Sequence, residues 1–187
     1  MCLTQGLTKN CAEPNQAGTE DKLYLIPAQW LDEPAFTVDP NGSLSAISID
    51  LVASGGVTGF YSYDLRRDAN GYRGELAGEQ PNLYIEQTVT AIIDKMNQDT
   101  RNVIQEWLDC RCGLVAIVVD NNCKQWVLGV SYNAACAKFQ IRGLRVAAGS
   151  AEQTGVDPTA DQNQYEVTLT TNSFELAREY SGVIPLA

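Results

Sequence analysis

The six cysteines are the most reactive side chains of this sequence, and they lie at Cys2, Cys11, Cys110, Cys112, Cys123 and Cys136. Zinc fingers and ribbons use two ligand pairs with about two to four residues between partners. Here only Cys110 and Cys112 are close, with Arg111 alone between them. A nucleophilic thiolate needs an activating base or cation in space, which sequence adjacency does not supply. We expect neither a zinc site nor a cysteine nucleophile. Most of these residues are expected to be small buried hydrophobic side chains, with Cys136 as an example. Disulfide formation outside a cell is the alternative.

The sequence contains no histidine. This absence excludes Ser-His-Asp and Cys-His catalysis, histidine-bound zinc or haem, and the commonest general base near neutral pH. Any two of the 23 Asp and Glu residues could meet in the fold as an acid–base pair, but no spacing singles out a pair. We therefore expect no catalytic residues, no metal site and no cofactor.

Three loop motifs are weak matches to known ligand-binding loops. Residues 68–71 and 157–161 carry the polar residues of a calcium loop, but neither continues to the ligand spacing and terminal Glu of an EF-hand. No Gly-Lys-Ser/Thr follows the glycine pair of residues 54–56, so no phosphate-binding loop can form there. Turns and loops explain all three segments better.

The chain is acidic, with 13 Lys and Arg against 23 Asp and Glu and a formal net charge of -10. Such a surface disfavours binding to the outside of a nucleic acid, because it repels phosphate, although many proteins are acidic for solubility alone. Base stacking on Trp30, Trp107 and Trp126 would need a basic groove, so core and interface packing is the better interpretation of these side chains.

One basic cluster stands out against this acidity. Arg66, Arg67 and Arg73 flank Asn70 and Gly71, and an Asn-Gly pair between two strand-like runs is a strong hairpin signal. The sequence predicts a hairpin over residues 58–77. Its tip is either simply solvated or a positive patch that docks on an acidic neighbouring copy. The candidate contact residues are Arg66, Arg67, Asp68, Asn70, Gly71 and Arg73, and in an assembly of stacked rings we expect them to form the contact between rings.

Hydrophobic periodicity predicts many short strands and one helix. The expected strands span residues 23–26, 44–52, 59–65, 72–76, 83–93, 114–119, 125–130, 139–148 and 165–170. The uninterrupted apolar run 114–119 predicts a central strand covered on both faces, followed by a hairpin at Asn121 and Asn122. A helix is expected near residues 99–109, capped by Asp99 or Asn102. Residues 149–164 are expected to form a long loop, and residues 173–180 a short helical turn.

Together these elements predict a mainly β (α+β) fold, an antiparallel β-sandwich or barrel with one α-helix and extended hairpins. With 187 residues and no internal repeat, we expect a single domain over 1–187, with an extended N-terminal arm and a C-terminal tail. No apolar run approaches the ~18 residues of a membrane helix. Residues 1–10 lack the pattern of a secretory signal, so we expect synthesis in a host cytoplasm.

Several short segments carry a family resemblance, and they are residues 2–8, Cys11, Gly18, residues 23–25, residues 113–118 with the turn at 121–122, and residues 165–169. On these segments the chain resembles the major tail or tail tube proteins of tailed phages and prophages of Bacteroidetes-type hosts. The resemblance implies a β-sandwich or barrel with one helix. It also implies homo-oligomeric rings of six subunits, stacked into a hollow tube in the virion tail and in contact with other tail proteins. Double-stranded DNA would pass through without specific binding, and a negative lumen would let the duplex slide.

Other functions stay open. The chain could be another virion component, such as a head decoration or tail terminator protein, or the tube of a contractile injection system. From different classes, it could be a small acidic ligand-binding module or an enzyme using paired carboxylates. Rings or polymers of the purified protein would favour the tube.

Overall fold

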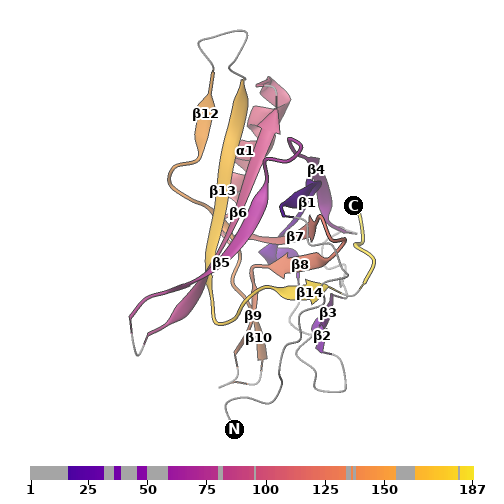
Figure 1. Cartoon of the computed structure of the whole chain (residues 1–187), viewed down its shortest axis with the longest axis vertical. Coiled ribbons are helices and arrows are strands. Elements are labelled where there is room, and N and C mark those ends of the chain that lie inside the picture. Colours follow the sequence, from indigo (N-terminus) through magenta and orange to yellow (C-terminus); the bar gives the residue numbers. More distant parts are fainter. Residues whose placement is uncertain are drawn as a thin grey trace.

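The computed structural model of the chain describes residues 17–31, 36–38, 46–49, 59–79, 82–94, 96–133, 136, 138–154, 163–180 and 182–187. Two sheets dominate this part of the chain, and one α-helix lies alongside the longer strands (Figure 1). The predicted class, a mainly β fold with antiparallel sheets and a single helix, is confirmed.

The first sheet has seven strands, which lie in the order β2 (Phe36–Val38), β3 (Ala46–Ile49), β14 (Arg178–Tyr180), β8 (Gln125–Leu128), β7 (Leu114–Asp120), β1 (Thr19–Pro27) and β4 (Tyr61–Asp64). All neighbours pair antiparallel except β14 and β3, which pair parallel. A 3₁₀ turn, η1 (Ala28–Trp30), follows β1.

The second sheet has five strands, which are β11 (Arg145–Val146), β13 (Gln164–Ser173), β6 (Tyr84–Asp94) and β5 (Gly71–Ala77) in that order, with β12 (Ala151–Gln153) also paired to β13. The long strands β6 and β13 pair over ten positions and form the middle of this sheet. Two shorter strands, β9 (Val130–Asn133) and β10 (Lys138–Ile141), form a separate hairpin.

Strand β7 is the central strand that its apolar sequence predicts. Its residues from Leu114 to Val119 are all buried, so both faces of the strand are covered. The hairpin to β8 is also confirmed, because Asp120 Oδ1 accepts hydrogen bonds from the backbone N–H groups of Asn122 and Lys124, both at 2.9 Å. A carboxylate that satisfies two turn amides fixes the register of this hairpin.

The predicted helix is α1 (Gln98–Asp109). Its N-cap is Asn97, not Asp99 or Asn102 as expected, because Asn97 Oδ1 accepts a hydrogen bond from Thr100 N at 2.7 Å. The cap position requires extended backbone, which Asn97 has and the residues already inside the helix do not. Trp107 is buried and meets Tyr63 edge-on, with ring centroids 4.9 Å apart.

The core has two parts, one on each face of the seven-stranded sheet. The first lies between the two sheets and α1, and its fully buried members are Leu23, Ala91, Ala116, Leu128, Leu144 and Leu169. The second lies on the opposite face of the seven-stranded sheet and includes Ile26, Phe60, Val115, Ile117 and Val127. Phe60 is held there by the C-terminal tail, since its N–H donates to Pro185 O at 2.7 Å.

The predicted hairpin over residues 58–77 is wrong. Strand β4 pairs with β1 in the seven-stranded sheet, whereas β5 pairs with β6 in the five-stranded sheet, so the chain crosses between sheets at residues 65–70. A type I′ hairpin turn needs positive φ at both central residues. Neither Asn70 nor Gly71 has one, and Asp68, with φ 58°, makes the bend instead. The hairpin that does form joins β5 to β6, where Gly78 has φ 87°.

Other expectations are corrected by long-range pairing. The predicted helical turn at 173–180 does not form, because Ser173 ends β13 and residues 178–180 form strand β14, which lies between β8 and β3. The predicted strand 139–148 is divided between β10 and β11, which belong to different sheets. The predicted loop 149–164 contains β12. Residues 1–16, 54–56 and 157–161 lie outside the described residues.

Candidate functional site

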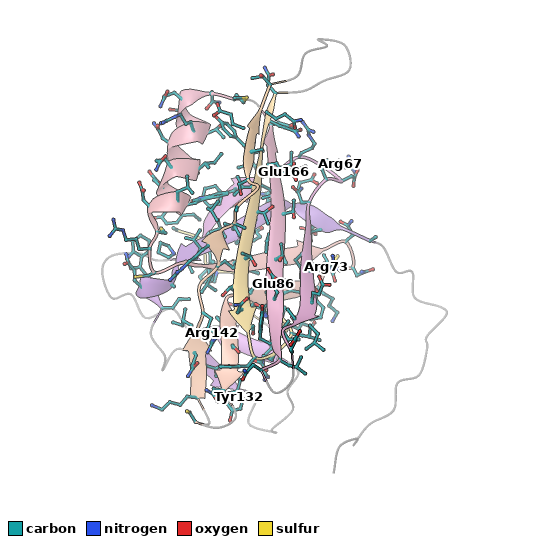
Figure 2. The ribbon with its side chains drawn as sticks, turned by 90° about the vertical axis from the view of Figure 1, so that its left-hand side faces the viewer. Arg67, Arg73, Glu86, Tyr132, Arg142 and Glu166 are labelled. Carbon is teal, nitrogen blue, oxygen red and sulfur yellow. The ribbon has the colours of Figure 1, made fainter. Side chains whose placement is uncertain are left out.

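The outer face, defined as the side of the five-stranded sheet turned away from the core, is the most distinctive surface of the molecule. Strict alternation along β6 and β13 buries Val89, Ala91, Val167 and Leu169 and turns the residues between them outward. The outward residues of these two strands are Tyr84, Glu86, Thr88, Thr90, Ile92, Asp94, Gln164, Glu166, Thr168, Thr170 and Asn172. Figure 2 looks onto this face and labels Glu86 and Glu166. Ile92 is the only aliphatic residue in that set.

Threonines form the centre of the outer face. Thr88 lies opposite Thr170, and Thr90 opposite Thr168. Such cross-strand threonine pairs stabilise a sheet whose face is hydrated. Thr170 Oγ1 also donates a hydrogen bond to Glu86 Oε1 at 3.2 Å. The face is therefore ordered by side-chain contacts within the sheet.

The charges on β6 and β13 all have one sign. These strands carry the carboxylates of Glu86, Asp94 and Glu166 and no lysine or arginine. In the described sheet, basic residues lie toward the edges: Arg66 and Arg73 near β5, and Arg145 on β11. The middle of the outer face is thus negative, and its positive charges lie at its borders.

At the β5 edge two carboxylates oppose each other. Glu75 on β5 lies directly opposite Glu86 on β6. Like charges at such positions destabilise a sheet. Arg73 offsets part of the repulsion, because its Nη2 lies 3.0 Å from Glu75 Oε2, but that ion pair is exposed.

The six residues predicted as a contact patch are divided by the crossing between sheets. Arg66 is partly buried and its Nε donates to Asp94 Oδ1 at 2.7 Å. Asn70 is buried, and Gly71 begins β5. Only Arg67, Asp68 and Arg73 are largely exposed, and Arg67 lies at the bend while Arg73 lies along β5 (Figure 2). Their role in contacts between rings stays a prediction.

A second pair of arginines lies at the opposite border of the same sheet, and the sequence analysis did not single it out. Arg142 and Arg145 line a cavity of about 430 Å³ together with Cys112, Ile141, Gly143 and residues 170–172. The guanidinium of Arg142 stacks on Phe174, with its carbon 3.9 Å from the ring centroid. Two arginines three residues apart in an acidic chain were the available sequence signal.

The cysteines correct the burial expectation. Cys112, Cys123 and Cys136 are exposed, and only Cys110, among the described cysteines, is partly buried. Each exposed cysteine lies in or beside a turn, where the backbone conformation outweighs the apolar preference of the side chain. Burial, helped by the nearby carboxylates of Glu106 and Asp109, raises the pKa of the Cys110 thiol. This thiol is therefore protonated at neutral pH and a poor nucleophile.

The described residues contain no group of three or more Cys, Asp or Glu placed to hold a metal ion. None of the helices in this part of the chain is long and apolar enough to cross a membrane.

A cavity with a volume of about 470 Å³ lies between α1 and the strands β12 and β13. Arg101, Ile104, Gln105 and Leu108 form its helical wall, and Tyr165 lies on the strand side. Tyr165 Oη and Glu152 Oε1 are 3.5 Å apart there. The cavity has the size of a small-molecule site.

Comparison of the chain with protein-family models, with curated proteins and with solved structures found no match.

Proposed function

We propose that this chain is the structural subunit of a phage tail tube, a virion protein that self-assembles into stacked rings around a channel for double-stranded DNA. The family resemblance of residues 2–8, 23–25, 113–118 and 165–169 suggests this function. The observation that carries it is the outer face of the five-stranded sheet, with its central threonines and its carboxylates.

The side chains of the outer face favour contact with water over packing against another protein surface. Its central threonine pairs leave no apolar cluster for a partner to cover in the described part of the sheet. Ten paired positions along β6 and β13 make it long for a molecule of this size. A long hydrated face on a rigid sheet is what the wall of an aqueous channel requires.

The charge distribution supports the passage of DNA in particular. Glu86 and Glu166 on the two central strands make no ion pair within the described part of the chain. Carboxylates facing a channel repel the phosphates of a duplex, so that DNA slides along the wall without binding.

The edges of the sheet support assembly. Strand β5 has β6 as its single partner among the described strands, which leaves the other edge of β5 open. An open edge of seven residues is a liability in a monomer, and pairing with another chain removes it. Because this edge differs from the β11 edge, copies would join head to tail, an arrangement that forms a ring when the rotation between copies closes.

Sedimentation velocity of the purified chain over rising concentration, with negative-stain microscopy of the same samples, tests the proposal. Rings or hollow tubes are expected. A head decoration protein would instead bind capsids, a terminator would form single rings that do not stack, and an injection-system tube would be found outside virions. A chain that stays monomeric at high concentration and is absent from purified virions would contradict the proposal.

The cavity beside α1 favours a second candidate, a small acidic ligand-binding module. Its volume of about 470 Å³ and the apolar side chains of Ile104 and Leu108 beside polar Arg101 and Gln105 suit an organic ligand. This candidate predicts a monomer whose thermal stability rises when a ligand from a small-molecule library binds. Ile104→Trp, which would fill the cavity, should then abolish that rise.

A further inference from the structure

The arginine site, defined as Arg142, Arg145 and the cavity of about 430 Å³ that they line, is a positive feature on an acidic protein. The cavity contains no Asp or Glu among its lining residues in the described chain. Neither arginine makes an ion pair with the described residues. Two guanidinium groups without an internal carboxylate can bind an external anion.

The position of Arg142 is fixed by its surroundings. Its backbone N–H donates to Gly129 O at 2.7 Å, and its carbonyl accepts a hydrogen bond from Thr171 Oγ1. Its guanidinium stacks on Phe174. A guanidinium held in this way loses little conformational entropy when it binds a carboxylate.

The opposite edge of the same sheet carries a suitable carboxylate. The exposed side chain of Glu75 lies on β5 and opposes Glu86, so it experiences a repulsion that Arg73 offsets only in part. A second cation at Glu75 would relieve this repulsion. In the described sheet no other residue is placed on the open side of β5 to supply it.

Strand direction allows these two edges to meet. Each neighbouring pair along the order β11, β13, β6, β5 is antiparallel. Strand β5 of one copy placed beside β11 of the next would therefore continue the same alternation along Arg145 and Val146, next to Leu144, which already pairs with Leu114 of β7. The sheet would extend from copy to copy with its outer face on one side.

The register across the sheet determines which residues of β5 and β11 would face each other between copies. Arg73, Thr88, Thr170 and Arg145 lie in one row across the sheet, and Glu75 lies two residues further along β5 than Arg73. A continuation without offset would place Arg145 beside Arg73 of the next copy, with like charges together. An offset of two residues keeps the same faces outward and places Arg145 beside Glu75.

We propose that the arginine site binds Glu75 of the adjacent copy in the ring, and that this contact sets the two-residue offset between neighbouring subunits. The inference deepens the proposed tube function and rests on it. The partner is a second copy of this chain, recognised by a carboxylate at the open edge of β5.

Charge reversal on each side, followed by mixing, tests the contact. Sedimentation velocity would be measured for wild type, Glu75→Lys, Arg145→Glu and an equimolar mixture of the two variants. Each variant alone is expected to assemble at least about tenfold more weakly than wild type, because it places like charges together. The mixture should recover rings in which the two variants alternate. At every second interface the introduced lysine of one variant meets the introduced glutamate of the other, and the remaining interfaces keep the native Glu75 and Arg145.

Arg101→Glu and Glu106→Lys on the exposed side of α1 are matched controls that should assemble like wild type. Circular dichroism checks that each variant is folded, and Glu75→Gln with Arg145→Gln replace any variant that is not, with weaker assembly again expected.

If wild type forms rings and the reversed variants do too, or if mixing restores nothing, the arginine contact is wrong and the tube function survives. If wild type does not assemble, both proposals fail. Binding of a DNA duplex that Arg145→Glu abolishes, with assembly unchanged, would assign the site to phosphate and overturn the contact.

Discussion

The side chain of Asn70 joins the crossing between the two sheets to the backbone of Ile92. Ile92 N–H donates to Asn70 Oδ1 at 2.9 Å, and Asn70 Nδ2 donates to the carbonyl of Arg66. In this way a buried amide extends the hydrogen bonding of β6 beyond the end of β5. The residue that predicted a hairpin turn instead holds the chain where it passes from one sheet to the other.

Asn70→Ala should lower the free energy of unfolding by about 1–3 kcal/mol, because it leaves the N–H of Ile92 and the carbonyl of Arg66 without their partner. Urea denaturation followed by circular dichroism measures this loss. Arg67→Ala, at the exposed bend three residues earlier, is the control and should change stability much less. Equal losses for the two variants would show that the Asn70 hydrogen bonds contribute little.

Gln87 links the two sheets through the core. It is fully buried, its Oε1 accepts from Gly129 N at 3.1 Å, and its Nε2 donates to Glu175 O at 3.0 Å. Gly129 has φ 87° and lies between β8 and β9, so this contact fixes the kink that separates them. Gln87→Leu keeps the volume but removes both hydrogen bonds, and a loss of about 2–4 kcal/mol is expected.

Thermal unfolding and chemical denaturation of Gln87→Leu measure this effect. Gln87→Glu should destabilise the protein more than Gln87→Leu, because the introduced carboxylate would be buried and cannot donate to Glu175 O. Val89→Leu, on the same inward face, controls for a change of core packing alone. A Gln87→Leu protein as stable as wild type would contradict the role of this side chain in joining the sheets.

Arg66 and Arg67 should behave differently when their charges are reversed. Arg66→Glu places a carboxylate against Asp94 in a partly buried site and should destabilise the monomer, whereas Arg67 is exposed and Arg67→Glu should leave its stability within about 0.5 kcal/mol of wild type. If Arg67 and Arg73 contribute to stacking of rings, Arg67→Glu with Arg73→Glu should shorten tubes without unfolding the subunit. Tubes of normal length would rule out that contribution.

Alkaline pH should destabilise the protein through Cys110. Burial raises the pKa of this thiol in the folded state above its ordinary value of 9.0, so the folded state binds the proton more tightly than the unfolded state. The stabilisation is complete below the unfolded pKa and is lost as the pH rises from there through the folded pKa. Cys110→Ala should therefore reduce the fall of unfolding free energy with pH in that range.

Denaturation curves at a series of alkaline pH values measure this slope, with reductant present to keep thiols free. The pKa values of Tyr63 and Tyr72 are also raised by burial, so they contribute at still higher pH in both proteins. Cys112→Ala, which removes an exposed thiol from the same turn, is the control. Identical slopes for wild type and Cys110→Ala would contradict the effect.

The sequence by itself determined the character of the main elements. Alternation along residues 83–93 and 165–170 predicted the strands β6 and β13, and the apolar run 114–119 predicted a strand buried on both faces. Helical spacing predicted α1 to within a residue at each end. These predictions succeed because periodicity is a local property: it records which side chains of an element turn toward the core.

Only the tertiary structure decided which strands pair, and therefore where the candidate surfaces lie. The Asn70-Gly71 pair was compatible with a hairpin between β4 and β5. Instead, Asn70 accepts a hydrogen bond from Ile92 of β6, and β5 pairs with β6 in the five-stranded sheet. Residues 178–180 form a strand because their backbone pairs with β8 on one side and with β3 on the other. The row that ends in Arg73 at one border and Arg145 at the other likewise joins the β5–β6 hairpin to β13 and β11, which lie more than 50 positions further along the chain. Such pairings depend on contacts between distant segments, whose energies no local pattern records.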